Sequence, residues 1–170
     1  MSMYLDIAGI AGESKSPNTN WNQKIEIQTM SYDVSQRTSM EAGSGMIASG
    51  AVFGAMHVTK AMDKSTPLLF GKLAAGEPIP TAIIRVSRPG AATTGPSGGL
   101  FEAETYTLQN IIVTSYGTSG TPGPGGLPLE SWSLAFTAIS EVYNTVDAAG
   151  NKQAPQTAGW DIAQGKSIGG

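Results

Sequence analysis

Residues 58–68 read VTKAMDKSTPL and pass from a strand pattern into the start of a helix. Immediately upstream the chain alternates, so that Met56, Val58 and Lys60 fall on one side and His57 on the other. An alternation with period two is typical of a strand that buries one face. The stretch therefore predicts a strand that leads directly into a helix.

The helix is expected over residues 63–76. Ser65 or Thr66 can cap its first turn, and Pro67 suits that turn because its missing N–H costs nothing there. Leucines one turn apart share a face, which gives the helix one side to bury. Gly76 is placed to end the helix in a left-handed conformation.

Alternating segments recur along the rest of the chain. They cover residues 24–28, 82–87 and 131–138. Residues 101–118 read as one long strand, or two collinear ones, with an irregularity near Gln109 and Asn110. These runs are rich in β-branched and aromatic residues, as pleated surfaces prefer.

Glycine and proline concentrate between the strands, at residues 42–50, 89–99 and 117–126. These stretches are expected to be loops, because glycine costs backbone entropy and proline lacks a donor. About seven to nine strands and one short helix then predict a mainly β chain, folded as a closed barrel or a sandwich.

The length and composition limit the number of domains and the kinds of partner that can be expected. The 170 residues fit one domain over 1–170. Lys and Arg number 10 and Asp and Glu 13, a net charge of −3, so neither nucleic acid nor an anionic membrane is expected as a partner. No stretch approaches the roughly 18 apolar residues of a membrane span. Residues 1–14 lack the basic and apolar blocks of a secretory signal.

The residues that usually carry chemistry are scarce. The absence of cysteine excludes zinc fingers, iron–sulfur clusters and thiol catalysis. The single histidine, His57, has no second histidine near it in sequence, so it is expected to be structural, and no metal or cofactor is expected. Gly43, Gly45 and Gly50 lack the spacing of a phosphate-binding loop.

Two further sets of residues, a carboxylate pair and the tryptophans, bear on whether the chain is an enzyme or a binding module. Glu102 and Glu104 are expected to share a strand face, which is a solvated face more readily than a catalytic pair. Residues 95–99 (GPSGG) fit the letters of the G-x-S-x-G motif, but they lie in a stretch rich in glycine and proline and not between a strand and a helix pattern, and the lone histidine has no evident orienting acid, so no enzyme is expected. Trp132 is expected in the core, while Trp21 and Trp160 leave open a secreted carbohydrate-binding module.

Five segments follow one another in a recognisable order. They are residues 10–14 (IAGES) after a first strand at 3–7, residues 25–36, residues 58–68, residues 111–116 and residues 159–162. Together they resemble the Hcp family, the tail-tube proteins of type VI secretion, and residues 58–68 match its pattern K-x-x-D-x-[ST]-[ST]-P. The matching motif residues are Gly12, Glu13, Ser14, Lys60, Asp63, Ser65, Thr66, Pro67 and Trp160. Residues 91–99 and 118–126 depart from the family as expanded loops.

The resemblance implies an architecture and a function. It implies a two-sheet β-barrel with one flanking helix, which forms homohexameric rings that stack into a hollow tube. It implies partners as well: further copies of the chain, the contractile sheath, the spike and effector proteins carried in the lumen. The protein would wait in the bacterial cytoplasm and leave through the type VI apparatus without a signal peptide.

Two sets of residues are assigned to assembly on this basis. The Gly-rich loop that follows the second strand is the candidate segment for reaching the next ring, because its apolar residues need a neighbour to cover them. Its candidate residues are Gly43, Gly45, Met46, Ile47, Gly50, Val52 and Phe53. Ser31 matches a lumen-facing position of the family and is the candidate cargo contact, although an ordinary exposed polar residue fits its place equally well. A phage tail tube protein remains an alternative.

Overall fold

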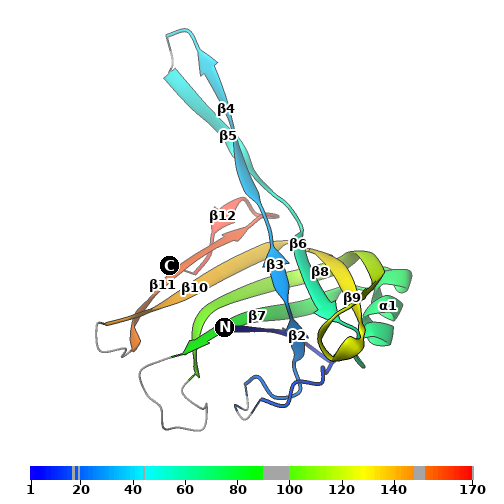
Figure 1. Ribbon diagram of the computed structural model, residues 1–170. Helices are drawn as coiled ribbons and strands as arrows, with labels where there is room; N and C mark the ends of the chain where they lie inside the picture. The colour runs from blue at the N-terminus through cyan, green and yellow to red at the C-terminus, as the bar shows by residue number, and fades with distance from the viewer. Residues whose placement is uncertain (17, 19, 44, 90–99, 148–151, 170) are drawn as a thin grey trace.

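Strands dominate the fold, and one helix accompanies them (Figure 1). The structure is a computed structural model that describes residues 1–170 except 17, 19, 44, 90–99, 148–151 and 170. The strands are β1 (Ser2–Ile7), β2 (Ile25–Ile27), β3 (Thr29–Ser31), β4 (Val34–Glu41), β5 (Gly45–Phe53), β6 (Met56–Ala61), β7 (Ile79–Pro89), β8 (Leu100–Pro122), β9 (Pro128–Ala135), β10 (Ala138–Val146), β11 (Lys152–Asp161) and β12 (Lys166–Ser167). The helix is α1 (Thr66–Ala75), and a 3-10 turn, η1, spans Pro124–Gly126. The expected mainly β class with one helix is confirmed.

Ten of the described strands form one antiparallel sheet system. Its main path runs β12-β11-β10-β8-β7-β1-β2, and a branch runs from β8 through β9 and β6 to β3. The main path and the branch enclose the core, whose buried residues come from both. Beyond β8, strands β10 to β12 extend the main path as a wing (Figure 1).

Strand β8 joins the two parts. Its first half pairs with β7 and β10, and its second half pairs with β9. Asn110, at the change of partner, has a φ of 48°, a left-handed conformation that asparagine tolerates better than most residues. The expected long strand with an irregularity at this point is confirmed. It runs on to Pro122, so the expected loop at 117–126 is wrong over its first half.

Strands β4 and β5 pair only with each other and leave the rest of the molecule as a two-stranded arm (Figure 1). The expected loop at residues 42–50 is therefore wrong over most of its length: Ala42 and Gly43 form a turn, and β5 begins at Gly45. Gly43, Gly45 and Gly50 have φ values of 91°, 76° and 111°, which let the chain reverse at the tip and bend along the arm.

Helix α1 is shorter than the expected span of 63–76. Ser65 is its N-cap residue, but the Ser65 hydroxyl donates to Asp63 and makes no capping bond to the helix. Gly76 ends the helix in the left-handed region with φ 62°, as expected, and its N–H donates to the Leu73 carbonyl.

Two expected strands are divided in the structure. Residues 131–138 were expected to be one strand, but β9 ends at Ala135 and β10 starts at Ala138. Residues 25–36 contain β2, β3 and the start of β4, because β2 pairs with β1 while β3 pairs with β6. The structure therefore has more described strands than the sequence predicted. The extra strands come from these two divisions, from the arm and from the short β12.

Candidate assembly site

A buried ion cluster connects the sequence motif at 60–67 to β9. The Lys60 ammonium, 1% exposed, lies 2.8 Å from Asp63 Oδ1 and 2.9 Å from Glu130 Oε2, and the Glu130 side chain is fully buried. Lys60 also donates to Thr66 Oγ1 at 2.9 Å, and Thr66 donates to Glu130. The motif residues Lys60 and Thr66 thus meet on a carboxylate that the motif does not contain, while Ser65 donates to Asp63, the other partner of Lys60.

Glu130 is held by neutral donors as well. The Trp132 indole N–H donates to Glu130 Oε2 at 3.3 Å, and the Tyr116 hydroxyl donates to Oε1 at 3.2 Å. Burial and the nearby Glu130 raise the pKa of Tyr116. Because buried charges are costly unless paired and hydrogen-bonded, the cluster fixes α1 against β6 and β9 rather than offering an open reaction site.

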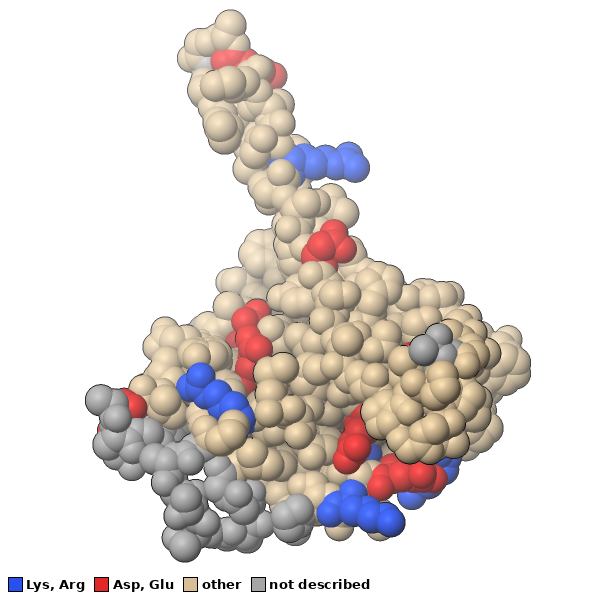
Figure 2. Space-filling model, in the orientation of Figure 1, with Lys and Arg blue, Asp and Glu red and all other residues tan. Residues whose placement is uncertain are grey.

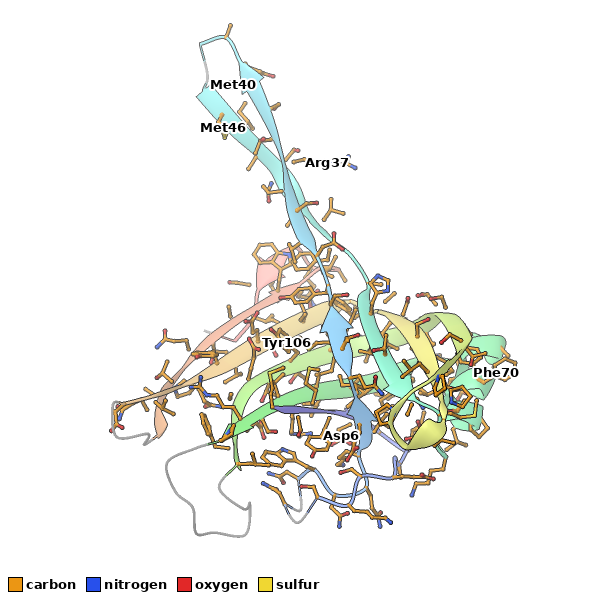
Figure 3. The ribbon with its side chains drawn as sticks, in the orientation of Figure 1. Asp6, Arg37, Met40, Met46, Phe70 and Tyr106 are labelled. Atoms are coloured by element: carbon orange, nitrogen blue, oxygen red, sulfur yellow. The ribbon has the colours of Figure 1, made fainter. Side chains whose placement is uncertain are left out.

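The arm carries large apolar side chains that no described residue of its own chain covers. Met40 and Met46, 82% and 70% exposed, face each other across the two strands near the tip (Figure 3). Ile47 and Val52 are also exposed, and only Phe53, at the base, packs against the core. A two-stranded ribbon is marginally stable alone in water, so this arrangement indicates a partner.

Ser31 lies on a second surface, the hydroxyl face, which is the outer side of β3, β6, β9 and the end of β8. Along one row Ser31 pairs with His57, and the His57 Nδ1 atom lies 2.8 Å from Ser133 Oγ. Ser133 Oγ in turn lies 2.7 Å from Ser115 Oγ. In the next row Thr29 and Thr59 hydroxyls are 2.7 Å apart. The face is polar and built mainly from small hydroxyl side chains, with His57 among them.

A hollow of about 200 Å³ lies at the base of the arm, lined by Tyr32, Phe53, Glu141 and Trp160 among others. The Tyr32 hydroxyl donates to Glu141 Oε2 at 3.3 Å. Burial and contact with Glu104 raise the pKa of Glu141, and burial with a bond to Glu104 raises that of Tyr106. Two carboxyl groups therefore face each other from β8 and β10 beside two tyrosines.

The expectation that Glu102 and Glu104 share a face is wrong. A β-bulge between Val86 and Ser87 shifts the register there, so that Val86 pairs with Glu104 and Ser87 with Glu102. Glu102 accepts a bond from Thr105, whereas Glu104 interacts with Tyr106 and Glu141.

The three tryptophans separate into two environments. Trp132 is in the core, as expected. Trp21 is 1% exposed and stacks on Tyr4 at 5.7 Å between ring centroids, while Trp160 is 36% exposed. The buried Trp21 cannot stack on a sugar, which removes half of the reason for a carbohydrate-binding module.

Comparison with known proteins connects this arrangement to a family. The family model described as "Type VI secretion system effector, Hcp" matches residues 4–143. The chain belongs to the Hcp family. It is 29% identical over 165 residues to Protein hcp1 of Pseudomonas aeruginosa, a match that covers 96% of each protein.

Solved structures of Hcp proteins have the same fold. The crystal structure of Hcp1 from Salmonella typhimurium has a TM-score of 0.75 and 26% identity, and the match covers 98% of both chains. A second structure, described as a type six secretion system protein, has a TM-score of 0.85 at 22% identity and covers 98% of this chain and 99% of that one. The Hcp chain is a structural subunit of the type VI secretion tail tube, and its family is a family of secreted tube proteins and not of enzymes.

Within the described residues, the Hcp chain shows no cluster of histidine, aspartate or glutamate suited to a metal ion. In the same part of the chain, no helix has the length and apolarity needed to cross a bilayer.

Glu130 and the Glu104–Glu141 pair of this Hcp chain were not predicted from the sequence. Glu130 alternates with Trp132 and Leu134 on a buried strand face, and a charge in such a position signals a buried counter-ion. The Glu104–Glu141 pair has no comparable signal, because it depends on the long-range pairing of β8 with β10, in which Tyr143 pairs with Glu104 and Glu141 with Tyr106.

The carboxyl pair of this Hcp chain makes its stability depend on pH. A carboxyl whose pKa is raised in the folded state adds stability below its ordinary pKa of 4.5, and loses that contribution as the pH rises through the folded-state value. Glu141→Gln removes the charge, so we expect its melting temperature to exceed that of the wild type by about 1–3 °C near neutral pH. Near pH 4 the advantage is expected to vanish, which thermal denaturation at both pH values will measure.

Glu77→Gln is the matched control, because Glu77 is exposed and pairs with Lys72 at 2.7 Å. It should give no gain at either pH. An equal gain for Glu141→Gln at both pH values would contradict the electrostatic explanation.

Proposed function

We propose that this chain assembles into homohexameric rings, and that the rings stack into the hollow inner tube of a type VI secretion apparatus. The arm carries the proposal. It places exposed methionine, isoleucine and valine side chains on a ribbon that packs against no other strand in the described part of its own chain. Identical copies repeated around a ring and along an axis would cover every arm in the same way.

The barrel expected from the family resemblance is part of this proposal. β2 and β3 are separated by Gln28 alone, and they pair with β1 and β6 respectively. β8 also pairs with both parts of the sheet system. The main path and the branch are therefore linked twice, once through β2 and β3 and once through β8. We regard this circuit as the tube wall unit, with α1 outside it.

The hydroxyl face is assigned to the lumen, with Ser31 as a cargo contact. A face of small uncharged side chains would hold an effector protein weakly, because it offers few fixed charges and few apolar pockets to bind it strongly. Polar hydroxyls also keep a water-filled channel wetted. Ser31 lies at the end of this face nearest the arm, beside His57.

The remaining partners follow from the tube itself. The outer surface would contact the sheath, the tube end would contact the spike, and effectors would occupy the lumen. The subunit would be stored in the bacterial cytoplasm and reach the exterior when the sheath contracts.

The test is the mass of the purified chain in solution. Light scattering coupled to size exclusion should give the mass of six chains, and negative-stain images should show rings with a central hole. The proposal fails if the chain stays monomeric across a wide range of salt and protein concentration.

A further inference from the structure

The hollow at the base of the arm combines aromatic walls with a carboxylate. Tyr32, Phe53 and Trp160 supply three rings to its lining, and Glu141 supplies the carboxylate. Its volume is about 200 Å³, below the ~300–1,000 Å³ of pockets that hold drug-sized ligands. A ligand of a few heavy atoms is therefore the size that fits.

The hollow joins parts of the chain that are far apart in sequence. Tyr32 follows β3 and Phe53 ends β5, so these two residues stand where the arm leaves and rejoins the body (Figure 1). Glu141 lies on β10 and Trp160 on β11, both in the wing. Trp160 is exposed, so solvent reaches the hollow. A ligand bound there would contact the arm and the wing at once.

The carboxyl pair beside the hollow has no basic partner among the described residues. Glu141 contacts Glu104, both side chains are half-buried, and none of the ion pairs between described residues includes either one. Burial and the contact with Glu104 raise the pKa of Glu141, so its charged form is poorly compensated. Figure 2 shows acidic side chains at the foot of the arm and on the body just below it. When the pair shares one proton, one negative charge still remains to stabilise a cation.

Arg88 shows how a cation is held near this carboxyl pair. Its Cζ atom lies 4.9 Å from the centre of the Phe101 ring and 5.9 Å from that of the Tyr143 ring, which is two residues from Glu141 on β10. Both distances lie within the ~6 Å over which the face of an aromatic ring attracts a cation. Arg88 thus contacts rings and forms no ion pair with a described carboxylate. The rings of the hollow offer the same attraction, which is strongest for tryptophan.

The lining favours an alkylammonium ion over a metal ion. Mg²⁺ and Ca²⁺ take about six or more oxygen ligands, whereas this lining is mostly aromatic and aliphatic. A primary ammonium group donates up to about three hydrogen bonds, and its alkyl stem packs against apolar surface. Glu141 Oε2 accepts one bond from the Tyr32 hydroxyl, and the carboxylate has further lone pairs that can accept from an ammonium.

We propose that this hollow binds a small primary alkylammonium ion, with the ammonium on Glu141 and the alkyl stem against Trp160 and Phe53. Two sources carry this group, a free amine and a lysine side chain of another protein. Every group that forms the site comes from one chain, so binding does not depend on ring formation. A bound amine would tie the base of the arm to the wing.

The exposure of Trp160 makes a direct test possible, because Trp21 and Trp132 are both buried. In the full chain labelled with fluorotryptophan, n-butylamine at neutral pH should shift one fluorine resonance until the shift saturates at millimolar concentration. Trp160→Phe identifies that resonance by its loss. The matched control ligand is n-butanol, which has the same number of heavy atoms without the charge and should bind about tenfold more weakly or worse.

Glu141→Gln keeps the size of the side chain and removes its charge. It should weaken the binding of n-butylamine by about tenfold or more and leave that of n-butanol unchanged. Unfolding does not explain such a loss, because the same variant is expected to melt above the wild type. Glu77→Gln, outside the hollow, should bind n-butylamine as the wild type does. A shift that never saturates, equal binding of the two ligands, or unaltered affinity in Glu141→Gln overturns the proposal.

Lysine with both its α-amino and α-carboxyl groups blocked as amides distinguishes the two sources. Binding equal to that of n-butylamine supports a lysine side chain of another protein as the ligand, whereas binding of n-butylamine alone supports a free amine. The outcome is separate from that of the proposed function. Rings that do not bind n-butylamine would disprove the amine site alone, and a monomer that binds it would disprove the ring alone.

Discussion

Replacing Lys60 by methionine is expected to lower the free energy of unfolding by about 3–5 kcal/mol, the usual cost of removing one member of a buried ion pair. Methionine fills much of the same volume, so the loss comes mainly from charge. It leaves the fully buried Glu130 carboxylate without its cation, and Asp63 loses its partner at 2.8 Å. The remaining bonds to Glu130 come from neutral donors, which do not balance a buried charge.

Urea denaturation of the variant and wild type at one protein concentration measures this cost, and the melting temperature should fall by about 10 °C or more. Lys72→Met is the control, because Lys72 is 31% exposed and pairs with Glu77 at the surface. It should change stability by less than about 1 kcal/mol. Combining Lys60→Met with Glu130→Gln should recover part of the loss. If Lys60→Met costs no more than Lys72→Met, the cluster does not hold the helix in place.

The sequence was most informative where local chemistry determines the structure. The passage from β6 into α1 depends on alternation, on Pro67 in the first turn and on Gly76 at the end, all of which act within a few residues. The irregularity at Asn110 was likewise a local signal, because a left-handed residue must interrupt a strand. These features could be predicted without knowing the partner strands.

The arm could not be recognised from composition alone. Glycine at 43, 45 and 50 indicates a loop by propensity, but the cross-strand pairing of Met40 with Met46 and of Val34 with Phe53 makes a ribbon of the segment. A glycine-rich turn between two segments of strand length was the available signal. It was obscured because both faces of the arm are exposed, so no hydrophobic face marks the strands.

The candidate site shows the same division. Lys60 and Thr66 were identified through a family pattern, but their shared partner Glu130 lies on a distant strand, where only its alternation with Trp132 indicates that it is buried. Long-range register decides which side chains meet, and bulges alter that register without a clear mark in the sequence.

Replacing Gly12 by alanine is expected to destabilise the chain by about 3 kcal/mol, the upper range for overpacking a filled site. A Cβ on Gly12 would overlap the backbone of Lys24 and Ile25, which cannot rotate away as a side chain can. Gly12 also donates to the Gln23 carbonyl at 2.8 Å, and Ser14 donates to the Lys24 carbonyl at 3.1 Å. The segment can escape the clash only by giving up these bonds.

Gly71→Ala is the control, because Gly71 lies within α1 and a Cβ there would meet nothing within 4 Å. It should stabilise the chain by about 0.5–1 kcal/mol, since alanine favours helix over glycine. Thermal and urea denaturation of both variants should therefore move in opposite directions. A Gly12→Ala protein as stable as the wild type would mean that the segment at 12–14 is free to move away from β2.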